Sequence, residues 1–114
     1  MRRSLVALTG VALVCATPAY AAKTKTIRVF DNSYSPKTVT VDKGTTVVWK
    51  WPGFDEAGDV HDVTLKSAPK GVKKFQSESA ATDYSFKRKL TVGGTYRIVC
   101  SLHEEMVQTI KVRR

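Results

Sequence analysis

A period of two residues in the apolar side chains is the feature that most restricts the fold of this 114-residue chain. Apolar and polar residues alternate in 37–42, 45–51 and 94–100. Successive side chains of a β-strand point to opposite faces, so this pattern predicts half-buried strands and no helix. Turn-forming residues separate the runs at short intervals, which favours an antiparallel sandwich. The predicted strands span residues 26–31, 37–42, 45–51, 60–66, 72–76, 84–91, 94–100 and 107–113.

The amino terminus has the features of a cleaved export signal. Arg2 and Arg3 precede an apolar run at 5–16, which is shorter than the about 20 residues that a membrane-spanning helix needs. Two alanines in the A-x-A arrangement of a signal peptidase site follow this run. We therefore predict a signal peptide at 1–21 and one domain at 22–114, located in the periplasm or outside the cell without a stable membrane anchor.

Two other interpretations of the leader are less well supported. Arg2 and Arg3 could direct a twin-arginine export route, but their flanking residues match that signal poorly. Cys15 could be lipidated, but Val14 is bulky for the position before a lipidated cysteine.

Removal of the leader changes the charge and the cysteine content. It leaves 17 of the 19 basic residues against 10 acidic ones, a net charge of about +7 with neutral histidines, and it leaves Cys100 as the only cysteine. Exported proteins usually carry cysteines in even numbers, so a single thiol indicates a reactive group or a metal ligand. An inert, buried Cys100 is an equal alternative from the cysteine count alone.

The strand pattern also predicts where four metal-binding side chains lie. His61, Cys100 and Met106 are each in phase with the apolar residues of a predicted strand, so they should point toward the core near strand ends. His103 lies on the short loop between Cys100 and Met106 and is free to approach the same point. The chain contains only two histidines, and both belong to this group.

The spacing Cys-x-x-His-x-x-Met, with a distant histidine, supplies a thiolate, two imidazoles and a thioether. Such a mixed, soft set suits one copper ion, because two histidines and a cysteine with a weak axial methionine form the blue-copper electron-transfer arrangement. Zinc is less suitable, since methionine is a poor fourth ligand for it. We predict a copper site at His61, Cys100, His103 and Met106.

The segment around these residues resembles a known family. Residues 96–103 are similar to the Tyr-x-Tyr-x-Cys-x-x-His segment of plastocyanin-like cupredoxins, the blue copper proteins. Residues 34–49 resemble the aromatic-x-Pro, Val-x-Val, Gly and Val-x-Trp run of that family, and 61–64 resemble its first-ligand strand. The resemblance covers nearly all of 26–113, and the two-residue gap after the second histidine is closer to amicyanin than to plastocyanin.

The resemblance implies an all-β, eight-stranded Greek-key β-sandwich with copper at one end. By matching position, His61, Cys100 and His103 would be the strong ligands and Met106 the axial ligand. Asp62 falls where relatives often have an asparagine that ties the first-ligand strand to the cysteine loop, and its partner here would be the Ser101 hydroxyl. A solvated Asp62 on the outer face is an alternative.

Gln108 is a second candidate for the axial position. It stands where many relatives have glycine, and it is in phase with Met106, so its side chain should point inward. An amide oxygen can act as an axial copper ligand. The alternative is a polar contact near the end of the strand.

The implied function is that of a mobile one-electron carrier outside the cytoplasm. A copper storage or delivery protein would use the same ligands, and an adhesive sandwich domain without copper is a third alternative. Multicopper oxidase or nitrite reductase chemistry would need more histidines than the two present, so we expect no enzymatic activity. We expect a monomer.

The distribution of charge predicts the kind of partner. Six of the 10 acidic residues should lie at the copper end, so we expect redox protein partners with a basic or neutral docking face. The basic run at 87–89 lacks interleaved aromatic residues, and we interpret it as a solvated strand face that binds no nucleic acid. The six acidic residues are Asp55, Glu56, Asp59, Asp62, Glu104 and Glu105.

Overall fold

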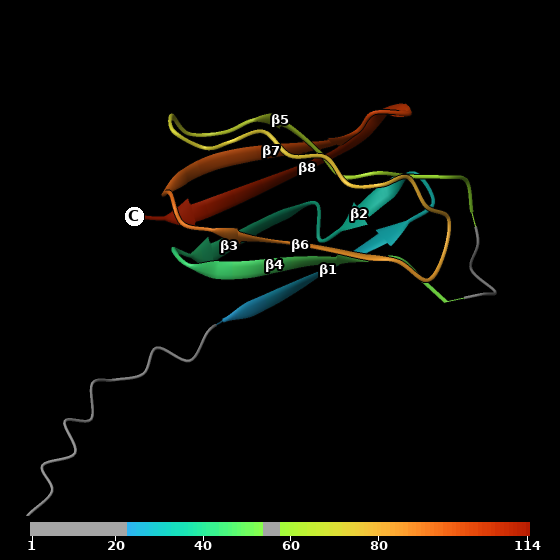
Figure 1. Cartoon of the computed structure of the whole chain (residues 1–114), viewed down its shortest axis with the longest axis horizontal. Helices are drawn as coiled ribbons and strands as arrows, with labels where there is room; N and C mark the ends of the chain where they lie inside the picture. Colours follow the sequence, from blue (N-terminus) through green and yellow to red (C-terminus); the bar gives the residue numbers. More distant parts are fainter. Residues whose placement is uncertain (1–22, 54–57) are drawn as a thin grey trace, which may run out of the picture.

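The computed structural model describes residues 23–53 and 58–114, so the predicted signal peptide lies outside the described residues. In these two ranges the chain forms eight β-strands and no helix, which confirms the all-β sandwich (Figure 1). Within the same ranges, no helix has the length and apolar character that crossing a membrane requires.

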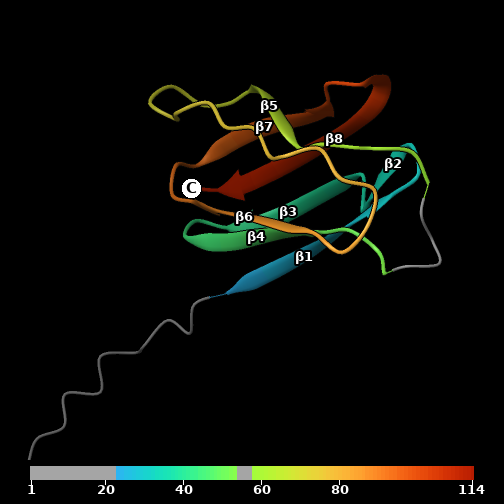
Figure 2. The same cartoon turned by 45° about the vertical axis from the view of Figure 1, so that its right-hand side comes forward.

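The strands form two four-stranded sheets, seen as two layers in Figures 1 and 2. The first sheet has the order β2 (Ser33–Ser35), β1 (Thr24–Phe30), β4 (Thr45–Lys50) and β6 (Ser85–Leu90). The second has the order β3 (Thr38–Asp42), β8 (His103–Arg113), β7 (Gly94–Cys100) and β5 (Thr64–Ser67).

The pairing is antiparallel except in two places. Strand β1 lies parallel to β4, and β3 lies parallel to β8, so the antiparallel arrangement that the turn spacing favours does not extend to these two pairs. Parallel neighbours need a connection that crosses over, and here the intervening strands belong partly to the other sheet. A period of two shows that a segment is a strand but does not show which strand lies beside it.

The core fills the space between the sheets with the alternating apolar residues that the sequence predicts. In β4, Val47 and Trp49 are fully buried, and Trp51 just beyond its end is 2% exposed. The ring of Trp49 packs against Phe75 and Phe86, with centroids 6.1 and 5.9 Å apart. The ring of Trp51 packs against Tyr84, with centroids 4.8 Å apart, so both tryptophans are packing residues of the core.

Several predicted strand boundaries are wrong. Residues 72–76 form no strand and contribute only a single bridge between Thr64 and Gln76, because Val72 and Phe75 are three residues apart and break the period of two. The predicted strand at 60–66 begins only at Thr64.

Two further boundaries differ at the chain turns. Residues 33–35, for which no strand was predicted, form the short strand β2, which buries only Tyr34 and is too short to show a periodic pattern. Strand β8 begins at His103 and not at residue 107, because the chain reverses directly after Cys100 and pairs at once.

Strand β6 is the outer strand of the first sheet, next to β4. Its central residues Lys87, Arg88 and Lys89 are exposed, between buried Phe86 and Leu90. Arg88 is in phase with these two apolar residues and therefore lies on the inner face of the strand. Its guanidinium lies over the ring of Phe86, 4.3 Å from the centroid.

Candidate metal centre

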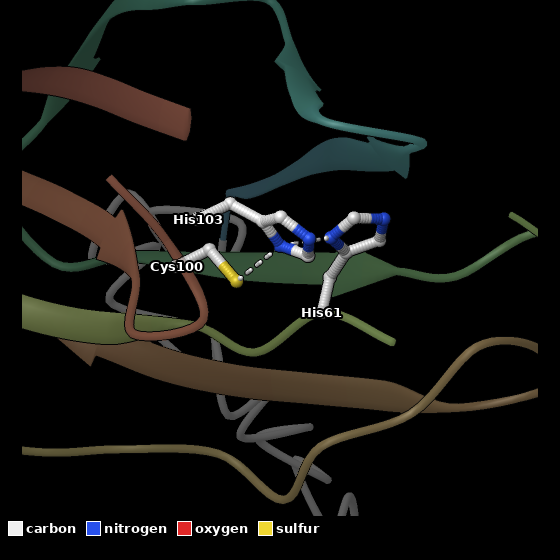
Figure 3. A group of neighbouring side chains, drawn as sticks. All are labelled: His61, Cys100 and His103. Carbon is white, nitrogen blue, oxygen red and sulfur yellow. Dashed lines mark hydrogen bonds between the residues drawn. The ribbon is translucent and has the colours of Figure 1, made fainter. Parts of the chain in front are cut away.

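Three of the four predicted ligands meet at one end of the sandwich. His61 lies in the segment before β5, Cys100 ends β7 and His103 begins β8, and the tight β7–β8 turn lies opposite the carboxyl terminus (Figure 1). One donor atom from each side chain lies within 4.8 Å of the others, and the three side chains point toward one another in Figure 3. Residues 42 positions apart in the sequence are thus brought together as predicted.

The separations of the donor atoms suit a single transition-metal ion. His61 Nδ1 lies 3.2 Å from His103 Nδ1, and Cys100 Sγ lies 3.5 Å from His103 Nδ1. Nitrogen and sulfur ligands lie about 2.0–2.3 Å from a metal such as zinc, so two ligands of one ion are roughly 3–4 Å apart. Both distances to His103 therefore match the spacing of neighbouring ligands, and the third pair, His61 and Cys100, lies within 4.8 Å.

Backbone pairing holds His61 in place although it precedes the strand. His61 and Ala80 form an isolated antiparallel bridge, in which each amide N–H donates to the other residue's carbonyl at 2.9 and 3.0 Å. Two residues later, the Val63 N–H donates to the Ser77 hydroxyl at 2.8 Å. The segment 77–80 thus fixes the first histidine, and no sequence pattern indicated this partner.

The β7–β8 turn holds the other two donors. The register shifts between Val99 and Cys100, and Cys100 then pairs directly with His103. The backbone N–H of Asp62 points at the cysteine sulfur, with N and Sγ 3.4 Å apart. This contact links the cysteine sulfur to the residue that directly follows His61.

Asp62 ties the His61 segment to the turn that carries Cys100. Its carboxylate accepts hydrogen bonds from the Ser101 hydroxyl and from the Ser101 backbone N–H, the latter at 2.9 Å. The residue is 1% exposed, so the alternative of a solvated Asp62 is wrong and the predicted tie to Ser101 is present. Burial alone would raise the pKa of Asp62, but hydrogen bonds from Ser101, Thr64 and Gln76 lower it below its ordinary value.

The outer nitrogen of each histidine contacts a carboxylate. His61 Nε2 lies 3.1 Å from Asp31 Oδ1, and His103 Nε2 lies 3.1 Å from Asp59 Oδ2. The backbone N–H of Val60 and the contact with His103 hold the pKa of Asp59 below its ordinary value. An ionised carboxylate can only accept a hydrogen bond, so these contacts favour Nε2–H histidines whose Nδ1 lone pairs are free.

Exposure differs between the ligand candidates. The side chain of His61 is 3% exposed and Cys100 is 2% exposed, whereas the side chain of His103 is 24% exposed. The neighbouring Leu102 is 55% exposed. His103 is therefore the point at which this group of donors reaches the surface.

Met106 and Gln108 both lie on the buried face of β8, as predicted, and are 1% and 0% exposed. Both ends of the Gln108 amide bond to groups outside the metal centre. Its oxygen accepts a hydrogen bond from Trp49 Nε1 at 2.9 Å, and its nitrogen donates to the Pro36 carbonyl at 2.8 Å. These contacts support the interpretation of Gln108 as a buried polar contact. Met106 remains the predicted axial ligand.

Sequence reasoning missed Asp31 and the contact of Asp59 with His103. Asp31 ends the predicted strand at 26–31 and looks like an ordinary turn residue. Only the packing of the β1–β2 turn against the segment at 58–61 brings its carboxylate to His61. Asp59 carried a weak signal, since it lies two residues before a predicted ligand.

Comparison with known proteins assigns the chain to a family. Residues 21–113 match the copper-binding proteins of the plastocyanin/azurin family. The chain belongs to this family. No curated protein sequence matches it significantly.

Solved structures of cupredoxins share the fold. Amicyanin from Paracoccus versutus (Thiobacillus versutus) superposes with a TM-score of 0.65 at 22% identity, covering 84% of this chain and 87% of that one. A reduced tryptophan-to-tyrosine variant of amicyanin gives a TM-score of 0.68 at 20% identity, with 84% and 88% covered.

A copper-containing nitrite reductase from Thermus scotoductus SA-01 is also similar. Its TM-score is 0.65 at 26% identity, and the match covers 78% of this chain. The chain spans only 22% of that enzyme.

The donor chemistry of the cluster agrees with the family's metal. Two imidazoles and a thiolate are the equatorial set that copper takes in blue-copper sites. If His61 and His103 are both Nε2–H, two bare Nδ1 lone pairs face each other at 3.2 Å, an arrangement that an electron-pair acceptor stabilises. Copper is the cofactor of this cupredoxin, and His61, Cys100 and His103 are its candidate ligands.

Proposed function

We propose that this cupredoxin is a mobile blue copper electron carrier that works outside the cytoplasm. His61, Cys100 and His103 are the proposed strong ligands and Met106 the axial ligand. The observation that carries the proposal is the convergence of one thiolate and two imidazole Nδ1 atoms, at the spacing of shared ligands, in a member of a copper-binding family. Bound copper would supply one-electron chemistry by cycling between Cu(I) and Cu(II).

The chain's own residues favour electron transfer because they hold the donors in one geometry. His61 is fixed by its bridge to Ala80, and Asp62 links the His61 segment to Ser101 in the ligand turn. A rigid ligand set changes little between oxidation states, which keeps the reorganisation energy small. The partly exposed His103 imidazole offers a route for the electron to a partner.

A role as carrier, and not as enzyme, is part of the proposal. The similarity to nitrite reductase extends over 22% of that enzyme, and only two histidines occur in this sequence. Both of them are committed to one site in the proposed assignment. A second metal centre with histidine ligands would have to be supplied from outside this chain.

Titration of the purified protein with Cu(II), followed by visible absorption and electron paramagnetic resonance, tests the proposal. We expect one copper per chain and an intense visible band, because a Cu(II)–thiolate bond produces the colour. Cys100→Ser should abolish the band, whereas Leu102→Ala, an exposed change in the same turn, should retain it. An intense band in the Cys100→Ser protein would refute the site.

Copper delivery is the alternative that the same protein must be tested against. A carrier should show fast electron self-exchange and retain its metal when Cu(I) acceptors are added. A delivery protein should instead transfer Cu(I) readily to a chelator. If Cu(I) passed to the chelator as fast as electrons exchange between copies of the protein, the carrier proposal would be contradicted. The assignment of the copper ligands would still stand.

A further inference from the structure

Each of the two histidines of the metal centre contacts a carboxylate through its Nε2 atom, and the sequence predicted neither contact. We propose that Asp31 and Asp59 are positioning residues that hold the Nδ1 lone pairs of His61 and His103 toward the metal and lower the reduction potential of the site. The inference rests on the proposed copper ligation by these two histidines. We call Asp31 and Asp59 the carboxylate pair.

The contacts are specific although both carboxylates face solvent. The Asp31 and Asp59 side chains are 55% and 67% exposed, but the rings that they contact are only 3% and 24% exposed. A buried imidazole N–H without an acceptor would be unfavourable, since it cannot bond to water instead. This argument applies to the enclosed His61 ring, for which Asp31 is the acceptor; His103 is partly exposed, and Asp59 is the acceptor that its Nε2 contacts.

The carboxylates decide which ring nitrogen carries the proton. Because they only accept, His61 and His103 should each be protonated at Nε2, which leaves Nδ1 bare. One contact favours an unprotonated Nε2 at His61, because the Asn32 backbone N–H also approaches this atom, at 3.3 Å. A ring nitrogen cannot donate and accept at once, and the shorter contact of 3.1 Å to a charged acceptor decides the assignment.

The carboxylate pair is connected internally. The backbone N–H of Asp59 donates to Asp31 Oδ1 at 3.2 Å, so the residue that contacts His103 is held by the residue that contacts His61. The adjoining Gly58 packs against Asp31 so closely that an added Cβ would lie 2.5 Å from the Asp31 Cγ atom. A side chain at position 58 would have to displace Asp31, so glycine is required here for the contact with His61.

The electrostatic consequence has a definite sign. A carboxylate that accepts the Nε2 hydrogen makes the imidazole a better donor at Nδ1, and its charge favours the more highly charged metal ion. Both effects stabilise Cu(II) more than Cu(I). Neutral replacements should therefore raise the reduction potential.

The first test uses metal-free protein, so it does not depend on copper. Long-range proton–nitrogen NMR at about pH 8, above the ordinary histidine pKa of about 6.5, reports the ring tautomers. We expect the Nε2–H form for both histidines. Asp59→Ala should give a tautomer mixture at His103, and Asp31→Ala should do so at both histidines because Asp31 also holds Asp59. Unchanged tautomers in both variants would overturn the positioning role.

The second test measures reduction potentials of copper-loaded variants. Asp31→Asn and Asp59→Asn should each weaken Cu(II) binding relative to Cu(I) about tenfold, which raises a one-electron potential by about 59 mV. Glu104→Gln is the matched control, because Glu104 is exposed, adjoins His103 and makes no hydrogen bond to either ring in the described part of the chain. Gly58→Ala should shift the potential in the same direction as Asp31→Asn but by less, because it displaces Asp31 without removing its charge.

The outcomes separate this inference from the proposed function. If Glu104→Gln shifts the potential as much as Asp59→Asn, the effect is one of net charge and the carboxylate pair has no special role. If the native protein shows no intense visible band, the copper proposal fails, while the tautomers of the metal-free protein still report whether the carboxylates orient the rings. Shifts in both variants, with a smaller shift in the control, support the inference.

Discussion

Gln108 is a polar residue that lies fully buried in the core. It is fully buried on β8 in the second sheet, yet its amide bonds to Trp49 on β4 of the first sheet and to the Pro36 carbonyl. Buried polar groups are favourable when every partner is satisfied. Both ends of this amide are satisfied, so Gln108 forms a hydrogen-bonded link between the two layers.

Replacement of Gln108 by leucine should therefore destabilise the fold. The change leaves the Trp49 indole N–H and the Pro36 carbonyl without their partner, and each buried unsatisfied group costs about 1–3 kcal/mol. Urea unfolding of the metal-free protein measures the loss. Val107→Thr, a change of similar size on the more exposed face of β8, should stay within about 0.5 kcal/mol of the native value. Equal stability of Gln108→Leu would show that the link contributes nothing.

The axial position can be tested at the same scale. Met106→Gln should retain copper and lower the reduction potential, because an amide oxygen favours Cu(II) more than a thioether does. Gln108→Leu should shift the potential less, since the Gln108 oxygen is bonded to Trp49. Voltammetry of the two variants decides between them. A larger shift for Gln108→Leu would mean that Met106 is the wrong axial ligand.

At the scale of strands, the ligand geometry depends on ties between segments that are distant in the sequence. Asp62 lies between His61 and β5 and accepts two hydrogen bonds from Ser101 beyond the end of β7. The Tyr34 hydroxyl of β2 donates to the Asp62 carbonyl at 2.6 Å, and burial raises the pKa of that tyrosine, with Cys100 and Asp62 adding to the effect. The metal centre is thus braced by both sheets.

Removal of this tie should loosen the ligand turn. Asp62→Ala takes away the acceptor of the Ser101 N–H, so the amide of Ser101 should exchange with deuterium faster. Copper should also dissociate faster, because the orientation of outer groups controls metal affinity by about 10–100-fold. Asp62→Asn keeps one oxygen acceptor and should have a smaller effect. Unaltered exchange at Ser101 in the alanine variant would contradict the role of the tie.

The sequence predicted which segments form strands better than it predicted which strands lie side by side. Six of the eight predicted strands overlap β1, β3, β4, β6, β7 and β8, and the period of two is clearest in β3, β4 and β7. The segment 60–66 was only partly correct, since His61 pairs with Ala80 outside any strand. The meeting of His61 and Cys100 followed from their phase with the apolar residues, and that of His103 from its place in the short loop after Cys100.

Contacts that depend on tertiary packing could not be predicted in this way. Asp31 reaches His61 only because the β1–β2 turn packs on the segment at 58–61. The parallel pairing of β1 with β4 depends on crossovers between sheets, which no local pattern encodes. Family resemblance indicated the fold but not these contacts, since the carboxylate pair does not belong to the quoted motifs.

For the whole molecule, the placement of charge matters more than its total. Asp31 and Asp59 lie at the two histidines, and Glu104 and Glu105 are exposed next to His103, so the copper end is acidic although the chain is basic overall. The predicted contribution of residues 55 and 56 lies outside the described residues. Electrostatic steering depends on the local field, which salt screens over about 8–10 Å.

Electron-transfer rates with small reagents should show this polarity. The rate with a cationic reagent should fall as ionic strength rises, because salt screens its attraction to the acidic residues beside His103, which are Asp59, Glu104 and Glu105. Combined Glu104→Lys and Glu105→Lys changes should reverse the slope. A native protein that reacts faster with the anionic reagent at low salt would show that net charge governs the encounter. For a protein partner, the same reasoning predicts a basic or neutral docking surface.

The outer strand β6 has a consequence for the protein in concentrated solution. An edge strand offers unpaired backbone groups to other chains, and the resulting intermolecular sheets lead to aggregation. Here Lys87 and Lys89 place like charges on that edge, and Arg88 occupies an inward position over the ring of Phe86. Extension of the first sheet by a second copy would bring these cations together and bury a guanidinium. The basic edge should therefore oppose the edge-to-edge association of two copies of this chain.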